Sequence, residues 1–130
     1  MYGILIVDDS PVLRRALRDH IGQNRDLEVC EEAENGQAAI EKFQQLKPDF
    51  VILDFSMPVM NGIEAARRIS SIAPEVPILM FTSFKSKELV QEAQKAGIDH
   101  VLSKSEAHDL VGAIKRIIQS RAQSPPARSE

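Results

Sequence analysis

The sequence predicts an α/β protein in which a five-stranded parallel sheet is covered by helices on both faces. Short apolar runs of strand length alternate five times with stretches whose apolar residues recur at helical spacing. Most of the runs are continuously apolar, which is typical of parallel strands buried on both faces. The chain has 130 residues, the size of one domain. This alternation predicts right-handed βαβ units and a doubly wound sheet.

The first half of the chain contains three predicted strands and two predicted helices. The first apolar run ends at two aspartates, and Ser10 followed by Pro11 is a typical helix cap and first helical position. Asn35 and Gly36 break the second run and start the second helix. The predicted strands cover residues 2–7, 27–33 and 49–54, and the helices are marked by Val12, Leu13, Ala16, Leu17 and Ile21, then by Ala39, Ile40, Phe43 and Leu46.

The second half repeats the same unit. Gly97 is expected to end the fourth helix, because glycine is common just past the last helical residue. The predicted strands cover residues 77–82 and 100–103, and the helices are marked by Ile63, Ala66, Ile69 and Ile72, by Leu89, Val90, Ala93 and Ala96, and by Leu110, Val111, Ile114, Ile117 and Ile118.

The helical pattern stops at about Ser120. The remaining stretch contains two adjacent prolines and no apolar periodicity. We therefore expect residues 1–120 to form one domain and residues 121–130 to form a flexible C-terminal tail or linker.

Composition excludes several classes of protein. Sixteen basic against nineteen acidic residues give a net charge of −3, without the positive surface that nucleic-acid binding requires. No apolar run is long enough to span a membrane, and the N-terminus lacks the pattern of a signal peptide. Cys30 is the sole cysteine, which suits a reducing compartment. We expect a cytoplasmic domain that binds neither nucleic acid nor membrane.

Polar side chains follow four of the five predicted strands. In an open α/β sheet, ligands bind at the carboxyl ends of the strands where the strand order reverses. With the flavodoxin-like order 2-1-3-4-5, the strands before Asp8, Asp9 and Asp54 flank that point. Thr82 and Lys104 end the next two strands. We therefore expect these five side chains to converge at one edge of the sheet.

Three neighbouring carboxylates repel one another unless a cation lies between them. Mg²⁺ prefers oxygen ligands and is often held by one or two carboxylates. A carboxylate is also a competent nucleophile toward phosphorus. Phosphoryl transfer mainly requires alignment and charge neutralisation, which Lys104, the Thr82 hydroxyl and a metal supply. The pattern favours phosphorylation of an aspartate over hydrolytic or redox chemistry.

These residues lie in motifs that resemble the receiver domain of bacterial two-component response regulators. The resemblance covers residues 1 to about 120, and the stretch around Asp54 is its most specific part. The matching segments are residues 4–10 (ILIVDDS), 53–62 (LDFSMPVMNG), 80–83 (MFTS), and 96–97 (AG) leading to Lys104.

The resemblance implies a role for each carboxylate. Asp54 is expected to be the phosphoacceptor. Asp9, Asp54 and the backbone carbonyl of Ser56 are expected to bind Mg²⁺ directly, and Asp8 through water. It also implies a regulatory switch rather than an enzyme, phosphorylated by a histidine kinase or a phosphotransfer protein.

The resemblance further implies that Thr82 and Lys104 bind the phosphoryl group and that Thr82 shifts. This shift would remodel the face of helix four, strand five and helix five, which contacts an output domain or partner protein. Two positions depart from the common pattern of the family. Val101 replaces an aromatic residue that rotates as a second switch, and Ser105 replaces a proline that often follows a cis peptide bond.

Three alternatives remain open. An aspartyl-phosphate phosphatase of the haloacid-dehalogenase type has a second aspartate at the position of Ser56, so serine there argues against it. In a flavodoxin-like cofactor module, the acidic strand ends would repel a flavin phosphate. The complete set of site residues argues against a receiver fold that has lost phosphorylation and serves only for docking, whereas Val101 leaves room for an altered switch. The cognate kinase, the output domain and the oligomeric state have no signal in the sequence.

Overall fold

The computed structural model describes residues 1–123 as one α/β unit. Strands and helices alternate throughout, as the apolar pattern predicts. The strands are β1 (Tyr2–Val7), β2 (Leu27–Ala33), β3 (Phe50–Leu53), β4 (Ile78–Thr82) and β5 (His100–Ser103). The helices are α1 (Pro11–Ile21), α2 (Gly36–Leu46), α3 (Gly62–Ile72), α4 (Lys87–Lys95) and α5 (Leu110–Gln123), with a 3₁₀ helix, η1 (Lys104–Asp109), before α5.

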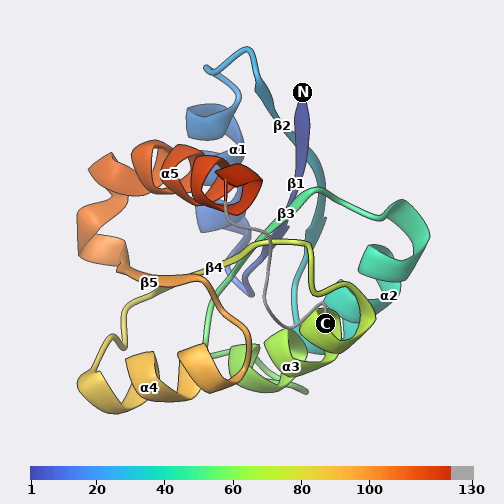
Figure 1. The fold of residues 1–130 in the computed structure, drawn as a ribbon, viewed down its shortest axis with the longest axis vertical. Helices are drawn as coiled ribbons and strands as arrows, with labels where there is room; N and C mark the ends of the chain where they lie inside the picture. Colours follow the sequence, from blue (N-terminus) through green and yellow to red (C-terminus); the bar gives the residue numbers. More distant parts are fainter. Residues whose placement is uncertain (124–130) are drawn as a thin grey trace.

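The five strands form one parallel sheet in the order β2-β1-β3-β4-β5 (Figure 1). In the register of β1 and β3, Val7 lies opposite Leu53, the last residue of its strand. In the register of β4 and β5, Thr82 lies opposite Ser103. Neighbouring strands therefore end at nearly the same level, which brings the residues that follow them to one edge. The predicted strand order is confirmed.

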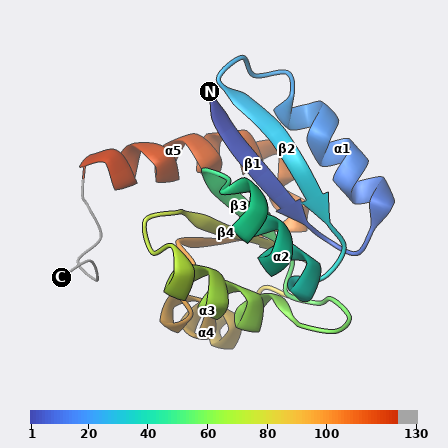
Figure 2. The ribbon, with the colours of Figure 1, turned by 90° about the vertical axis from the view of Figure 1, so that its right-hand side faces the viewer.

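The sheet has an apolar core on each face. One core contains β-strand residues together with α2, α3 and α4, and the other contains the alternate strand residues together with α1 and α5. Figure 2, turned by 90° from Figure 1, shows this separation into three layers. The central strand β3 is buried along its whole length, which explains its continuous apolar sequence.

Four of the helices begin at a side-chain cap. In each, a side-chain oxygen accepts a hydrogen bond from the backbone N–H three residues later, which satisfies a donor that has no partner within the helix. The caps are Ser10, Asn35, Asn61 and Ser86. Because these caps stand at the carboxyl ends of β1 to β4 or in the loops that follow, they place the helix starts on the same side as the polar strand ends.

The structure adds two details to the predicted pattern. The segment between β5 and α5 is a 3₁₀ helix rather than an extended loop. The last helix continues to Gln123, three residues past the point where apolar periodicity ends. Residues 124–130 of the expected tail lie outside the described residues. Among the described helices, none combines the length and the apolar character needed to cross a membrane.

Candidate functional site

Three carboxylates meet at the carboxyl edge of the sheet. Asp8 and Asp9 follow β1, and Asp54 follows β3, its neighbour in the sheet. One oxygen from each of the three carboxylates lies within 4.8 Å of the others. Asp8 and Asp54 are buried, whereas Asp9 is exposed. The cluster is therefore buried on the side of Asp8 and Asp54 and open to solvent on the side of Asp9.

Asp54 is held by contacts to both its backbone and its carboxylate. Its backbone N–H donates to the carbonyl of Val7 at 3.0 Å, which continues the ladder between β3 and β1. Its Oδ1 accepts the backbone N–H of Phe55 at 2.7 Å, and its Oδ2 accepts Lys104 Nζ at 2.9 Å. With 5% of its surface exposed, Asp54 has a fixed orientation in a confined space.

Asp8 has a similar set of contacts and is 3% exposed. Its Oδ1 accepts the backbone N–H of Ser10 at 2.9 Å, and its Oδ2 accepts Lys104 Nζ at 2.9 Å. Burial raises the pKa of Asp8, and these two bonds offset that effect only in part, while the charge of Asp54 adds to it. The ionised form of Asp8 therefore lacks enough positive charge around it.

Lys104 bridges the two buried carboxylates. It follows β5 directly and reaches across the edge of the sheet, so that its Nζ lies 2.9 Å from both Asp8 Oδ2 and Asp54 Oδ2. Burial lowers its pKa, but the hydrogen bonds and charges of Asp54 and Asp8 outweigh that effect, and the net pKa is raised. Lys104 is a permanent cation shared between two anions, and neither of them has another side-chain counter-ion among the described residues.

Thr82 occupies the end of β4, the strand next to β3. It is fully buried, and its Oγ1 accepts the backbone N–H of Phe84 at 3.2 Å. The hydroxyl proton has no acceptor among the described residues and remains free to donate. Val101, on β5, lies opposite Met80 and is buried, 5% exposed, in the core that includes α4. The two expected switch residues, Thr82 and Val101, therefore lie on neighbouring strands of the sheet.

The loop after Asp54 is tightly bound to the site. A Cβ added at Gly62 would lie 2.2 Å from the carbonyl oxygen of Asp54, so the start of α3 approaches closer than any other residue allows. Between them, Val59 has a φ of 70°, and the N–H of Met60 donates to the carbonyl of Pro58 at 2.7 Å. This is a classic γ-turn with a β-branched residue at its centre, a rare and strained arrangement.

The donor set fits a hard divalent cation. Three carboxylates supply oxygen ligands within a small volume, and the exposed position of Asp9 leaves room for water and for a phosphate oxygen. The Ser56 carbonyl, in the same loop, accepts no hydrogen bond from any residue that the structure describes. A cation would also supply the positive charge that buried Asp8 lacks. These are the properties expected of a Mg²⁺ site.

Two contributors were not predicted from the sequence. Arg14, on α1, donates from Nη1 to the backbone carbonyl of Asp8 at 2.6 Å and so fixes the loop that carries the acidic pair. Nothing in its surroundings distinguishes it from Arg15. Gly62 belongs to the motif around Asp54, but the sequence did not predict its close approach to the Asp54 carbonyl. Ser105, the departure next to Lys104, donates its N–H to the Ser103 hydroxyl at 3.2 Å, a bond that proline cannot make.

Comparison with known families gives one clear match. The family described as "Response regulator receiver domain" matches residues 4–115. The transcriptional regulatory protein LnrK of Bacillus subtilis is 37% identical over 127 residues, which cover 97% of this chain and 58% of that protein. A protein-glutamate methylesterase/protein-glutamine glutaminase of Methanosarcina mazei is 40% identical over 119 residues, 89% of this chain and 33% of that protein. The chain spans only part of the length of these relatives.

Solved structures share the fold. A two-component response regulator of the LuxR family from Aurantimonas has a TM-score of 0.88 at 30% identity, with 92% of this chain and 86% of that chain covered. The response regulator domain of Thermotoga maritima CheB has a TM-score of 0.83 at 30% identity, with 92% and 95% covered. A CheY-like receiver protein from Methanospirillum hungatei, 23% identical with a TM-score of 0.87, covering 95% of this chain and 98% of that chain, agrees in fold.

Proposed function

Because this chain belongs to the response regulator receiver domain family, we propose that it is a phosphorylation-dependent switch that accepts a phosphoryl group on Asp54. The observation that carries this proposal is the pairing of Asp54 with Lys104 beside two further carboxylates at the edge of the sheet. The donor would be a histidine kinase or a phosphotransfer protein. We propose that residues 1–120 form the switch, which is regulatory rather than enzymatic, and that residues 121–130 lead to an output domain or partner.

In the proposed reaction, a carboxylate oxygen of Asp54 attacks the phosphorus of the donor. A new P–O bond forms to Asp54, the bond from phosphorus to the donor breaks, and the electron pair leaves with the donor group. Phe55 and Lys104 already hold the two carboxylate oxygens in place. We assign Mg²⁺ to Asp9, Asp54 and the Ser56 carbonyl, with Asp8 acting through water; the ion would neutralise negative charge on the transferred group.

After transfer, the phosphoryl group would bring more negative charge next to Lys104 and Thr82. Lys104 would pair with a phosphoryl oxygen in place of the Asp54 carboxylate, and the free hydroxyl proton of Thr82 would donate to another. We propose that this pull on Thr82 is passed through β4 to the packed layer of β5 and α4. Val101 would respond by repacking rather than by the ring rotation of an aromatic residue.

We place this switch in the cytoplasm, where two-component signalling takes place and where a lone cysteine such as Cys30 remains reduced. The proposed partners are proteins, contacted through the face formed by α4, β5 and α5. Neither nucleic acid nor a membrane is proposed as a partner of this domain, in keeping with its net charge of −3.

The first prediction concerns the acceptor. Incubation with a small phosphodonor and Mg²⁺ should add one phosphoryl group to the wild-type chain by intact mass, and Asp54→Asn should abolish the gain. Asp49→Asn is a matched control, because Asp49 precedes β3 at the opposite end of the strand. Equal labelling of Asp54→Asn would refute the assignment of Asp54. Steady release of phosphate beyond one equivalent would instead indicate a phosphatase.

A further inference from the structure

Asp9 is the member of the acidic cluster whose side chain has no partner. Its carboxylate makes no hydrogen bond or ion pair with any residue that the structure describes, whereas Asp8 and Asp54 both bind Lys104. The proposed function nevertheless assigns Asp9 a direct bond to Mg²⁺. Fixing an exposed side chain costs conformational entropy, so the strength of that bond depends on how well the backbone orients Asp9.

The backbone that carries Asp9 is held by Arg14. Within the described part of the chain, the peptide group between Asp8 and Asp9 has a single hydrogen bond, from Arg14 Nη1 to the Asp8 carbonyl at 2.6 Å. The preceding peptide group is held independently, because the Asp8 N–H donates to the carbonyl of Ala33 on β2 at 3.0 Å. Without Arg14, the peptide group that leads into Asp9 would have no hydrogen bond of its own.

Arg14 is itself anchored to β2, the strand alongside α1 (Figure 2). Its Nε donates to Glu32 Oε1 at 3.0 Å, and its side chain is 17% exposed. A guanidinium is planar and presents its donors in a fixed fork, so the bond at Nε restricts the direction in which Nη1 can donate. Glu32 also offsets the charge of Arg14, which would otherwise repel a cation bound by the acidic cluster.

These contacts point to a role for Arg14 in metal binding. We propose that Arg14 is a positioning residue of the Mg²⁺ site, which orients Asp9 through the peptide group that Asp9 shares with Asp8 and does not touch the metal. The role rests on the proposed assignment of Mg²⁺ to Asp9 and Asp54. Because loss of a group that orients a metal ligand commonly weakens binding by about 10- to 100-fold, Arg14→Met should raise the dissociation constant for Mg²⁺ by about tenfold.

The direction of this change separates orientation from charge. Arg14→Met removes a positive charge close to the acidic cluster and leaves Glu32 without one of its two arginine partners. By Coulomb's law alone, both effects would tighten the binding of a cation. Loss of orientation weakens the binding instead. A rise in the dissociation constant therefore has a geometric cause, since electrostatics predicts a fall.

Arg18, one turn further along α1, is a matched control. Its Nε donates to Glu32 Oε2 at 2.7 Å, and its Nη1 donates to a backbone carbonyl, that of Val29 on β2, at 3.2 Å. Arg18→Met removes the same charge and the same kinds of bond but leaves the peptide group before Asp9 intact. Its dissociation constant for Mg²⁺ should stay close to that of the wild type, because solvent screens a side chain that is 44% exposed.

Amide NMR titration of the full chain with magnesium chloride measures the dissociation constants, and urea unfolding shows whether the two variants differ in stability. The proposal predicts weaker Mg²⁺ binding in Arg14→Met alone, and a displaced carbonyl ¹³C resonance of Asp8 in the same variant without metal. Equal dissociation constants in Arg14→Met and Arg18→Met, or tighter binding by Arg14→Met, would overturn the role of Arg14 and leave the proposed switch intact. A wild-type chain that binds no Mg²⁺ would instead refute the metal assignment, and the role of Arg14 with it.

Discussion

Asp8 carries the clearest electrostatic conflict among the single residues of the site. It is 3% exposed, it shares Lys104 with Asp54, and burial raises its pKa above the ordinary value of 3.8. An acid with a raised folded-state pKa contributes stability below pH 3.8 and loses it as the pH rises through the folded pKa. At neutral pH the ionised carboxylate therefore opposes folding, which is a common property of sites built to bind a cation.

The second prediction follows from this conflict. Asp8→Asn keeps an oxygen for the Ser10 N–H and leaves Lys104 paired with Asp54, so removal of the desolvated charge should raise the free energy of unfolding at neutral pH. Urea unfolding measures the change. Asp9→Asn is the control, because exposed Asp9 should give a smaller effect. Destabilisation by Asp8→Asn would show that its ionised form supports the fold.

The third prediction concerns the strained turn in the loop that carries Ser56. Val59 has a φ of 70°, which disfavours an L-residue by about 1–2 kcal/mol and is easily adopted by glycine. Val59→Gly should therefore stabilise the protein by about 0.5–1 kcal/mol in urea unfolding, after the greater unfolded-state entropy of glycine is included. Val12→Gly, equally exposed but helical, should instead destabilise it by about 0.5 kcal/mol. The same sign for both variants would contradict the strain.

The residues of the candidate site were predictable because each one ends an apolar run. Asp8, Asp54 and Lys104 are far apart in sequence, yet parallel strands bring their ends to one edge, and the structure joins them at 2.9 Å. The turn at Val59 was not predictable, since local preference opposes a positive φ at a β-branched residue. The bond from Arg14 to the Asp8 carbonyl was also missed, because it depends on how α1 lies on the sheet.

At the scale of elements, α1 is fastened to the edge strand β2 through one acidic residue. Glu32 accepts Arg14 Nε at 3.0 Å and Arg18 Nε at 2.7 Å. Partial burial raises the pKa of Glu32, but the hydrogen bonds and charges of Arg18 and Arg14 outweigh this effect and leave it below its ordinary 4.5. Because Arg14 also binds the Asp8 carbonyl, this contact links the edge of the sheet to the site.

The fourth prediction is the pH dependence of this contact. An acid with a depressed folded-state pKa contributes stability above pH 4.5 and loses it as the pH falls through the folded pKa. The contribution is about 1 kcal/mol or less, since solvent screens the partly exposed pair. Glu32→Gln should lower the free energy of unfolding at neutral pH and flatten its fall below pH 4.5, as urea unfolding at several pH values can measure. Glu28→Gln, an exposed neighbour on β2, should do neither.

Most elements were predictable from local sequence, and the exceptions have physical causes. The caps at Ser10 and Asn35 and the break at Gly97, with its φ of 91°, act within a few residues and can be identified without tertiary structure. The 3₁₀ helix after Lys104 has no apolar periodicity and buries no residue, so no pattern predicts it. The last turn of α5 is held by the long-range bonds of Arg121 to Asp99 and Pro74, which periodicity cannot indicate.

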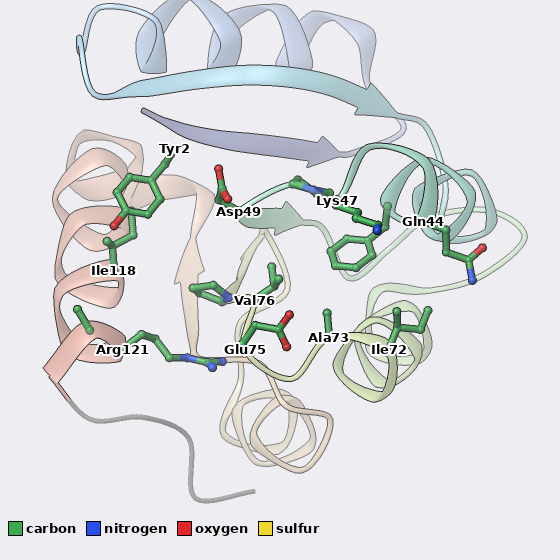
Figure 3. A pocket seen from close by; sticks show the side chains of 14 residues that line it. Tyr2, Gln44, Lys47, Asp49, Ile72, Ala73, Glu75, Val76, Ile118 and Arg121 are labelled. Carbon is green, nitrogen blue, oxygen red and sulfur yellow. The ribbon is translucent and has the colours of Figure 1, made fainter. Parts of the chain in front are cut away.

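At the scale of the whole molecule, one sheet separates two concave sites. Its carboxyl edge holds the acidic cluster, and its amino edge holds a pocket of about 670 Å³ where α5 ends (Figure 3). The fold class and the first site follow from the rule that ligands bind at the carboxyl ends of parallel strands. No such rule predicts the pocket from the sequence, because its lining comes from several segments that carry no recognisable motif. Only the packed structure brings them together.

The fifth prediction tests the central claim that occupation of the acidic site remodels a distant face. Amide NMR spectra of the full chain should be recorded with Mg²⁺ alone and with Mg²⁺ plus beryllofluoride, a mimic of the phosphoryl group. The account predicts shifts at Asp54 and Thr82 that extend to Val101 and to residues of α4 and α5, and their loss in Asp54→Asn. Shifts confined to the loops after β1 and β3, or shifts that persist in Asp54→Asn, would contradict it.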